Sequence, residues 1–304
     1  MKTFPWPVLG GRAPAWTGQG FVLGADQVPV LDYEAGASGW NEDLTRLHED
    51  AAGEGTHPID VASRRRARSA LRRHLGGAEA PVILEAGCSS GFLLQELADE
   101  WPGALVIGSD FIPGPLYRLA TRRPDIPLLR FDLVHCPLPS ASVDAVVLLN
   151  VLEHIEDHEA AMRQVARILR PGGVAIIEVP AGPQLYDAYD RYLQHYRRYR
   201  LRDLCALLEG AGLAVRARSH LGFFLYPAFA VVKRRNQRWL DAPEHEQRRV
   251  VEQSIGKSSD SLLLRWTTSL EESLGRWISY PAGIRCVAVA QRPASGPAGG
   301  DLIK

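Results

Sequence analysis

The 304-residue sequence is poor in cysteine, has no excess of either charge and lacks long apolar runs. Its four cysteines are far apart and form no C-x-x-C pair, which argues against a disulfide framework or zinc site and favours reduced thiols in a cytoplasmic protein. Lys plus Arg and Asp plus Glu each number 35, so no overall charge attracts nucleic acid. No secretory leader is expected, because the first residues lack a basic region followed by an apolar one.

The most apolar run, Leu221–Val232, is too short to span a membrane and contains Pro227. A basic triplet, Lys233 to Arg235, follows it. We interpret the run as a helix that forms a pocket wall or part of the core. Contact with a membrane surface is the less favoured alternative, and no stable membrane insertion is expected.

The segment Val82–Leu93 contains a short apolar strand, an acidic residue, two glycines and the start of an amphipathic helix. Gly87 and Gly91 permit a sharp turn and let a ligand lie against bare backbone. Amide groups at the start of the following helix favour an anionic or carboxylate-bearing ligand. The spacing lacks both the middle glycine of the dinucleotide fingerprint and the Lys-Ser or Lys-Thr of a P-loop. It therefore predicts another kind of nucleotide-type cofactor loop, with an unliganded glycine hinge as the alternative.

Four more apolar segments follow at the spacing of a doubly wound sheet. The first runs into Ser109-Asp110, about twenty residues beyond the glycine loop, where a carboxylate can accept hydrogen bonds from ribose hydroxyls. Phe111 and Ile112 would offer apolar contact to an adenine ring. The expected strands are Ala104–Gly108, Pro127–Arg130, Val143–Leu149 and Val174–Val179.

These motifs together resemble the class I S-adenosylmethionine-dependent methyltransferases that act on small molecules, quinones and lipids. The resemblance covers Pro81–Pro180 and includes Asn150-Val-Leu-Glu-His154 and Leu169-Arg-Pro-Gly-Gly173. It implies an α/β fold: a doubly wound, Rossmann-like, mostly parallel seven-stranded sheet with helices on both faces and an antiparallel last strand near Gly283–Ala290. It also implies a site for S-adenosyl-L-methionine, with S-adenosyl-L-homocysteine as product. The residues implied for it are Glu85, Gly87, Cys88, Gly91, Asp110, Phe111, Ile112, Asp132, Leu133 and Asn150.

We expect four parts along the chain. Residues 1–60 form an N-terminal cap or lid, residues 61–180 the cofactor-binding core, residues 181–292 the rest of the core with helical insertions, and residues 293–304 a flexible tail. Within them, Val61–Leu75 is interpreted as a basic helix with a solvated face. Ser261–Leu274 is an amphipathic helix that suits the core or a homodimer contact.

The segment Ala181–Arg200 contains a D-x-x-x-x-H-x-R-R-Y pattern that related methyltransferases often carry. It ends in His195, Arg197, Arg198 and Tyr199, and it follows the fifth strand, so it borders the cofactor crevice. A histidine beside two arginines and several tyrosines can supply a base, anion contacts and hydroxyl donors. The alternative is that the arginines pair with acidic residues of the same loop and hold it in place.

Methyl transfer by in-line displacement requires an aligned nucleophile in a site closed to water, and an acidic nucleophile requires a base. The candidate bases are His195, then His154, then Glu178, a carboxylate in an apolar strand whose pKa burial would raise. For Glu178 the alternative is an ion pair with an arginine such as Arg197. No metal is expected. The E-x-x-E-H motif that holds a divalent ion in some quinone O-methyltransferases has Asn150 in place of its first carboxylate.

The acceptor is expected to be a hydrophobic small molecule of natural-product or lipid-like type that carries an anionic group. Its binding residues would be Tyr33, Trp40, Arg197, Arg198, Tyr199, Phe223 and Phe224. C-methylation of a prenyl diphosphate is an alternative within the same class. A dinucleotide-dependent oxidoreductase and a non-catalytic scaffold with the cofactor fold are the alternatives from other classes.

Overall fold

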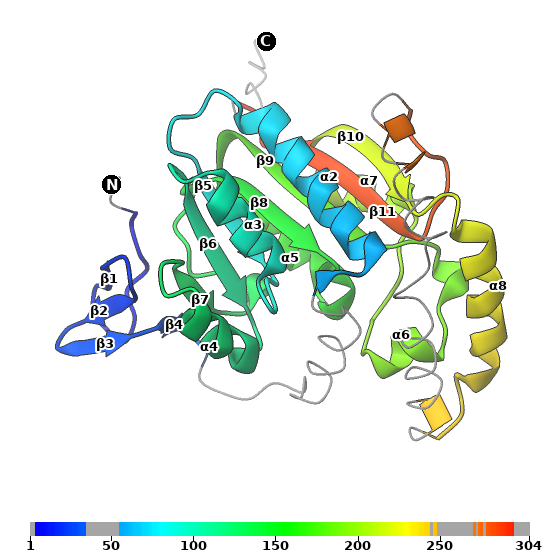
Figure 1. Ribbon diagram of the computed structural model, residues 1–304, viewed down its shortest axis with the longest axis horizontal. Helices are drawn as coiled ribbons and strands as arrows, with labels where there is room; N and C mark the ends of the chain where they lie inside the picture. Colours follow the sequence, from blue (N-terminus) through cyan, green and yellow to red (C-terminus); the bar gives the residue numbers. More distant parts are fainter. Residues whose placement is uncertain are drawn as a thin grey trace, which may run out of the picture.

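A central sheet of eight strands, in the order β10-β11-β9-β8-β5-β6-β7-β4, organises the protein (Figure 1). The computed structural model describes residues 4–34, 55–243, 246–247, 270–271, 273–275 and 278–294. Trp40, most of Ser261–Leu274 and most of the expected tail lie outside these residues. The strands are β4 (Val30–Asp32), β5 (Val82–Ala86), β6 (Leu105–Asp110), β7 (Leu128–Arg130), β8 (Val143–Leu149), β9 (Leu169–Pro180), β10 (Ala214–Leu221) and β11 (Arg285–Gln291).

Strand β11 runs antiparallel to both of its neighbours, as expected for the last strand, whereas the pairs among β4 to β9 are parallel. The described sheet has one strand more than the seven expected, because β4 from the N-terminal segment pairs with β7. Strand order reverses at β5, which lies between β6 and β8. In such sheets ligands bind outside the carboxyl ends of the strands at this reversal.

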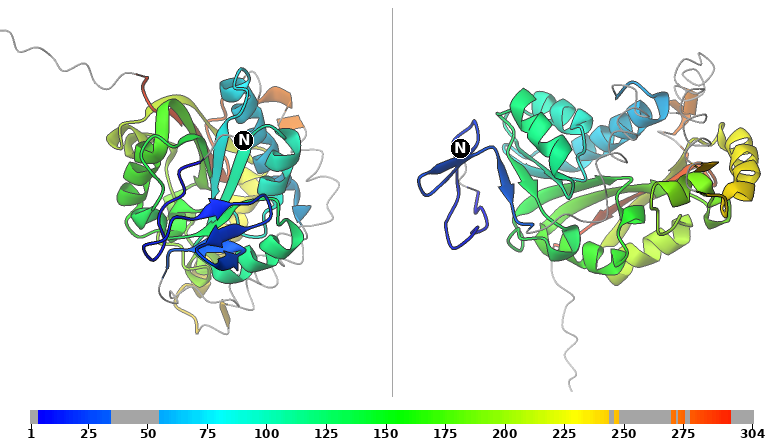
Figure 2. Two further views of the ribbon diagram at one scale, coloured as in Figure 1. Left: turned by 90° about the vertical axis from the view of Figure 1, so that its left-hand side faces the viewer. Right: turned by 90° about the horizontal axis from the view of Figure 1, so that it is seen from below.

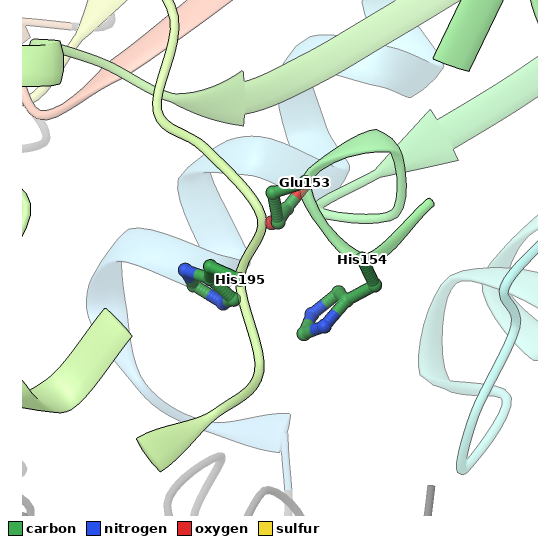
Figure 3. A group of neighbouring side chains, drawn as sticks. All are labelled: Glu153, His154 and His195. Atoms are coloured by element: carbon green, nitrogen blue, oxygen red, sulfur yellow. The ribbon is translucent and has the colours of Figure 1, made fainter. Parts of the chain in front are cut away.

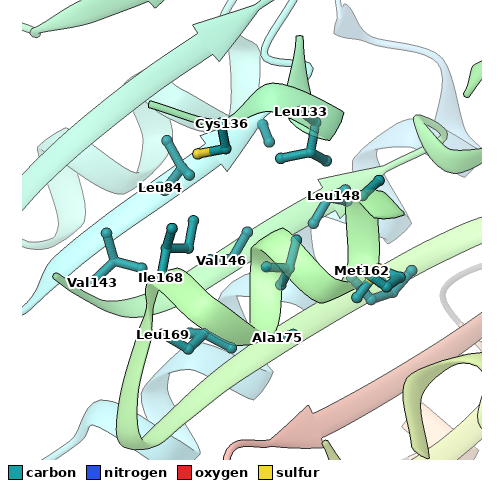
Figure 4. Close-up of a cluster of buried hydrophobic side chains, with 14 of the residues drawn as sticks. Leu84, Leu133, Cys136, Val143, Val146, Leu148, Met162, Ile168, Leu169 and Ala175 are labelled. Atoms are coloured by element: carbon teal, nitrogen blue, oxygen red, sulfur yellow. The ribbon is translucent and has the colours of Figure 1, made fainter. Parts of the chain in front are cut away.

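Helices cover both faces of the sheet (Figures 1 and 2). Successive strand residues point to opposite faces, so Ile83 packs with α2, α3 and α4 while Leu84 packs with α5 and α7. Figure 4 shows the second of these two apolar clusters. The helices are α2 (Pro58–Leu75), α3 (Phe92–Glu100), α4 (Pro113–Arg122), α5 (His158–Ile168), α6 (Ala188–Tyr192), α7 (Leu201–Gly210) and α8 (Tyr226–Asn236).

Helix α2 is the expected basic helix. Its apolar side is buried against the sheet, and three of its arginines lie along α3, where Arg64 pairs with Glu96 at 2.8 Å and Arg68 with the same carboxylate at 3.0 Å. Arg72 pairs with Glu100. This part of the basic face is therefore matched by acidic side chains of a neighbouring helix.

The N-terminal segment forms a separate antiparallel sheet of three short strands, β1 (Ala15–Trp16), β2 (Phe21–Leu23) and β3 (Asp26–Val28), beyond the β4 edge (Figure 2). Trp6 and Trp16 pack on Phe21 with ring centroids 4.9 and 4.8 Å away. Residues 4–34 thus extend one edge of the main sheet, and the role of residues 1–60 as a lid stays a prediction.

The apolar run Leu221–Val232 was expected to form a single helix. In the structure it contains the end of a strand, a short connection and the start of a helix. Leu221 ends β10, and α8 begins only at Tyr226. Pro227 lies in the first turn of α8, where a missing amide costs no helical hydrogen bond. No helix among the described residues has the length and apolar character to cross a bilayer. All four cysteines are free and buried.

Candidate functional site

A cavity of about 1150 Å³ opens where β5, β6, β7, β8 and β9 end. Each of these strands contributes lining residues at or just beyond its carboxyl end. The lining from these strands comprises residues 85–90, 109–112, 131–134, 149–151, 153–157 and 180. The cavity therefore occupies the reversal in strand order, where the topology predicts a ligand.

The loop after β5 is tied to the end of β6. Gly87 and Cys88 both donate their amides to the Ser109 carbonyl, at 2.8 and 2.9 Å. Gly87 has φ 76°, and a Cβ atom there would lie 2.4 Å from Cγ2 of Val151. A side chain at position 87 is thus excluded both by backbone conformation and by space. Ser89, with φ 44°, continues the left-handed turn.

Asp110 closes this loop. One of its carboxylate oxygens accepts the Ser89 amide at 2.8 Å, and the other accepts the Ile112 amide at 2.9 Å. Burial raises the pKa of Asp110, although the backbone donors oppose the shift. Each oxygen keeps a second lone pair, so the carboxylate can also accept from hydroxyls of a ligand in the cavity.

Nine of the ten residues expected at the cofactor site line this cavity. The exception is Gly91, which has φ 77° and precedes α3 as its N-cap, where an added Cβ would meet the Leu119 side chain. Glu85 is buried, and burial raises its pKa well above the usual range. The lining members are Glu85, Gly87, Cys88, Asp110, Phe111, Ile112, Asp132, Leu133 and Asn150.

Glu153, His154 and His195 meet at the side of the cavity formed by the end of β8 and the segment after α6 (Figure 3). Their possible ligand atoms all lie within 4.8 Å of one another, and we call them the Glu-His-His cluster. The two imidazole rings meet edge to face with centroids 4.6 Å apart. Burial raises the pKa of Glu153 to about 8.

A buried ionic network holds His195. Its Nδ1 atom lies 2.9 Å from Oδ1 of Asp190, which also accepts Nη1 of Arg198 at 2.8 Å. Lys233 Nζ reaches the other oxygen of Asp190 at 2.9 Å and Asp187 at 2.7 Å. Burial lowers the pKa of His195 despite the opposing effect of Asp190. Burial alone would raise the pKa of Asp190, but these cationic and hydrogen-bonding partners hold it well below its usual range.

The residues of the H-x-R-R-Y pattern form two groups: two line the cavity, and two hydrogen-bond to a neighbouring segment. His195 and Arg198 line the cavity, whereas Arg197 and Tyr199 do not. Arg197 donates to the carbonyls of Ile155 and Glu156 at 2.6 and 2.7 Å, and the Tyr199 hydroxyl donates to the Leu152 carbonyl at 3.2 Å. Arg197 and Tyr199 thus hold the segment that carries Glu153 and His154, instead of facing an acceptor.

Glu178 does not face the crevice, contrary to expectation. Alternation along β9 turns it toward α2, where its Oε1 accepts Ser63 Oγ at 2.6 Å and Arg285 Nη1 at 2.8 Å. Arg285 also donates to Asp60 at 2.6 Å. The carboxylate is therefore half of a buried ion pair, and its partner is Arg285 instead of Arg197.

Among the described residues that were expected to bind the acceptor, Arg198 is the one that lines the cavity. Phe223 stacks on Tyr280, Phe224 is exposed, and Tyr33 donates its hydroxyl to the Pro7 carbonyl at 2.7 Å, so none of the three lines the cavity. The apolar wall comes from one face of α8 together with the residue just before the helix. Its members are Leu225, Ala228, Phe229 and Val232, whose helical spacing is the sequence signal that would have identified them.

Acidic groups outnumber basic groups along the cavity. Its described lining contains nine carboxylates, from Asp60, Glu85, Asp110, Asp132, Glu153, Glu156, Asp157, Asp187 and Asp190. It contains four Arg or Lys side chains, and each is ion-paired within the protein: Arg64, Arg198, Lys233 and Arg285. This lining therefore favours cationic ligands and gives no support to the anionic group expected on the acceptor.

Comparison with known proteins agrees with the site's position in the fold. A family model for the methyltransferase domain matches residues 60–218, just over half of the 304-residue chain. A Mycolicibacterium smegmatis protein described as a probable S-adenosylmethionine-dependent methyltransferase is 35% identical over 135 residues, which cover 44% of this chain and 52% of the relative. A demethylmenaquinone methyltransferase from Corynebacterium urealyticum is 31% identical over 129 residues, or 41% of this chain and 54% of the relative. The chain thus spans about half the length of these curated relatives.

A solved structure shares the fold. A candidate sarcosine dimethylglycine methyltransferase from Galdieria sulphuraria superposes with a TM-score of 0.56 at 14% identity, covering 83% of this chain and 99% of that one. At such low identity the likeness shows the fold alone. With the domain match and the glycine loop at the reversal of strand order, the chain belongs to the class I S-adenosylmethionine-dependent methyltransferase family.

Proposed function

We propose that the protein transfers a methyl group from S-adenosylmethionine to a hydrophobic small molecule bound in the same cavity. The observation that carries the proposal is the position of Asp110. Its carboxylate locks the glycine loop through Ser89 and Ile112 while lining the cavity beside that loop. In this arrangement Asp110 would receive the ribose hydroxyls, and the backbone from Gly87 to Ser89 would lie along the amino-acid part of the donor.

The excess of acidic side chains along the cavity supports S-adenosylmethionine as the methyl donor. The bound donor would supply an electrophilic methyl carbon on a positively charged sulfur, and the surplus of carboxylates favours a cation over a dinucleotide with its pyrophosphate. Asp110 and Asp132, two of the residues expected to hold the donor, are among these carboxylates. The chain's own part is to align the acceptor, exclude water and receive a proton if the acceptor releases one.

The acceptor half supports a largely apolar substrate of natural-product or quinone-like type. The α8 wall presents Leu225, Ala228, Phe229 and Val232, and the Glu-His-His cluster gives the polar point of attachment nearby. His195 and His154 are the two expected bases that line the cavity, so we propose that the reacting group of the acceptor meets them. The relative named as a demethylmenaquinone methyltransferase agrees with an acceptor of this character.

Calorimetry with S-adenosylhomocysteine and, separately, with a nicotinamide dinucleotide tests the proposal. Saturable heat with the first and none with the second is the expected result. Binding of the dinucleotide alone would favour an oxidoreductase, and no heat with either would favour a scaffold that has kept the fold. A mass-shift screen of phenolic and quinol acceptors with the methyl donor would then identify the substrate.

A further inference from the structure

A general base that accepts a proton from the acceptor requires one side chain, whereas the Glu-His-His cluster brings three ionisable side chains together. We propose that Glu153, His154 and His195 bind a divalent transition-metal ion of the zinc type, whose open position faces the acceptor. The ion site itself stands on the geometry of these three side chains, whereas its use in methyl transfer rests on the function proposed above.

The three donors are close enough to share one ion. Their ligand atoms lie within 4.8 Å of one another, and ligand atoms around a tetrahedral zinc ion, bonded at 2.0–2.1 Å, are about 3.4 Å apart. Binding of an ion would require the three side chains to move closer by up to about 1.4 Å. One glutamate with two histidines is also the donor set of several catalytic zinc sites, which leave a fourth position for water or substrate.

Glu153 gives a second argument for a cation at this position. Its side chain is 1% exposed, and its Oε2 atom has no hydrogen-bond partner among the described residues. An unpaired buried carboxylate oxygen is costly and unusual in folded proteins. A metal ion at the cluster would satisfy this atom.

The surroundings of His195 are those of a metal-binding histidine. Its Nδ1 atom lies 2.9 Å from Asp190, and Asp190 is held in turn by Arg198 and Lys233. A carboxylate that accepts one ring N–H fixes the tautomer and leaves the other ring nitrogen with a free lone pair.

The inference differs from the expectation of no metal. That expectation rested on Asn150, which replaces the first carboxylate of the E-x-x-E-H motif and leaves only two ligands there. The fold adds His195, which stands 41 residues after His154 and lies beside it, with ring centroids 4.6 Å apart. An ion held there would bind a phenol or enol oxygen of the acceptor and lower its pKa before methyl transfer.

The test is metal binding to the full chain after removal of metal with a chelator. We expect calorimetry to show one Zn²⁺ per chain, and Co²⁺ to give the visible absorption of a four-coordinate site. Glu153→Gln and His195→Gln should each weaken Co²⁺ binding by at least about 100-fold, and Asp190→Asn by about 10- to 100-fold. Glu159→Gln and His135→Gln, on side chains that are 70% and 81% exposed, are the matched controls and should bind as the wild type does.

Absence of stoichiometric Co²⁺ or Zn²⁺ binding would overturn the inference, as would wild-type affinity in either ligand variant. Two ligand variants are used because one of them could fail to fold, and S-adenosylhomocysteine binding reports folding in each. Donor binding without metal binding would refute only the ion site. Metal binding without donor binding would refute only the proposed function.

Discussion

Nδ1 of His195 and Oδ1 of Asp190 lie 2.9 Å apart in a buried position beside the cavity. Because they stand five residues apart across the end of α6, the contact is set by local chain geometry. The carboxylate determines which ring nitrogen faces the cavity, whether that nitrogen receives a proton or binds an ion.

Asp190→Asn should therefore lower kcat by about 10- to 100-fold while leaving the affinity for S-adenosylhomocysteine unchanged. The amide can present its NH₂ group to His195 and stabilise the wrong tautomer. Asp203→Asn, on a carboxylate that is 52% exposed, is the control. Steady-state kinetics with the identified acceptor check the prediction, and an unchanged kcat would show that the pair is structural.

Asp110→Ala should weaken S-adenosylhomocysteine binding by about 10- to 100-fold, the value of a charge-assisted hydrogen bond. The substitution also releases the amides of Ser89 and Ile112, so the loop loses its anchor. Asp125→Ala is the control, since this carboxylate is 56% exposed and pairs with Arg123 on the surface. Equal affinities of the two variants in calorimetry would contradict the assigned donor position.

Gly87→Ala should lower the free energy of unfolding by about 2–4 kcal/mol through backbone strain and overpacking. Its new methyl group would lie 2.4 Å from Val151. Gly172→Ala is matched to it, because Gly172 has φ 84° with nothing within 4 Å, so only the strain of about 1 kcal/mol remains. Urea unfolding measures both variants, and equal losses would mean that Val151 simply moves aside.

His158 should make stability depend on pH. Burial, followed by the Arg197 guanidinium, lowers its pKa from 6.5, while Glu159 and Asp157 oppose the shift. The unfolded chain then binds the proton more tightly, so the stability that His158 contributes is present above pH 6.5 and is lost as pH falls through the folded value.

Replacement of His158 by Gln removes this titration. The stability of the wild type should therefore fall relative to His158→Gln between about pH 7 and about pH 5. Because the ring is partly exposed, the change should stay below about 1 kcal/mol. Urea unfolding of both proteins at several pH values checks it, and a constant difference would show that the pKa is the same in both states.

Phe229→Ala should raise the KM for the acceptor about tenfold with donor affinity unchanged, because it removes a large part of the apolar α8 wall. Phe224→Ala is the control, since Phe224 is 40% exposed and does not line the cavity. Similar KM values for both variants would place the acceptor elsewhere in the cavity.

The sequence indicated which residues after β5 and β6 would line the cavity, because these residues follow directly on buried strands. Once the strand ending at Asp110 is identified, topology brings its end beside the loop after β5. Strands β5 and β8 were also recognisable as continuous apolar runs. Strand β4 was missed because three residues carry no periodicity, and β10 because its first half alternates apolar residues with exposed arginines.

The α8 residues that line the cavity were not predicted, because their position depends on how α8 packs. Lys233 was interpreted as part of a basic helix end, yet it is buried between Asp187 and Asp190. Glu178 was assigned to the crevice from its place near the end of a strand. The face of the sheet on which its side chain lies depends on the register of the strand. A shift of one residue would move the side chain to the opposite face.

The parallel pairing of β4 with β7 has a consequence for the behaviour of shortened chains. β7 is buried along its whole length, and the backbone groups on its outer side are hydrogen-bonded to β4. A chain that began after Asp32 would leave that edge open to strand addition by another molecule. Removal of the N-terminal segment is therefore expected to promote self-association through the β7 edge.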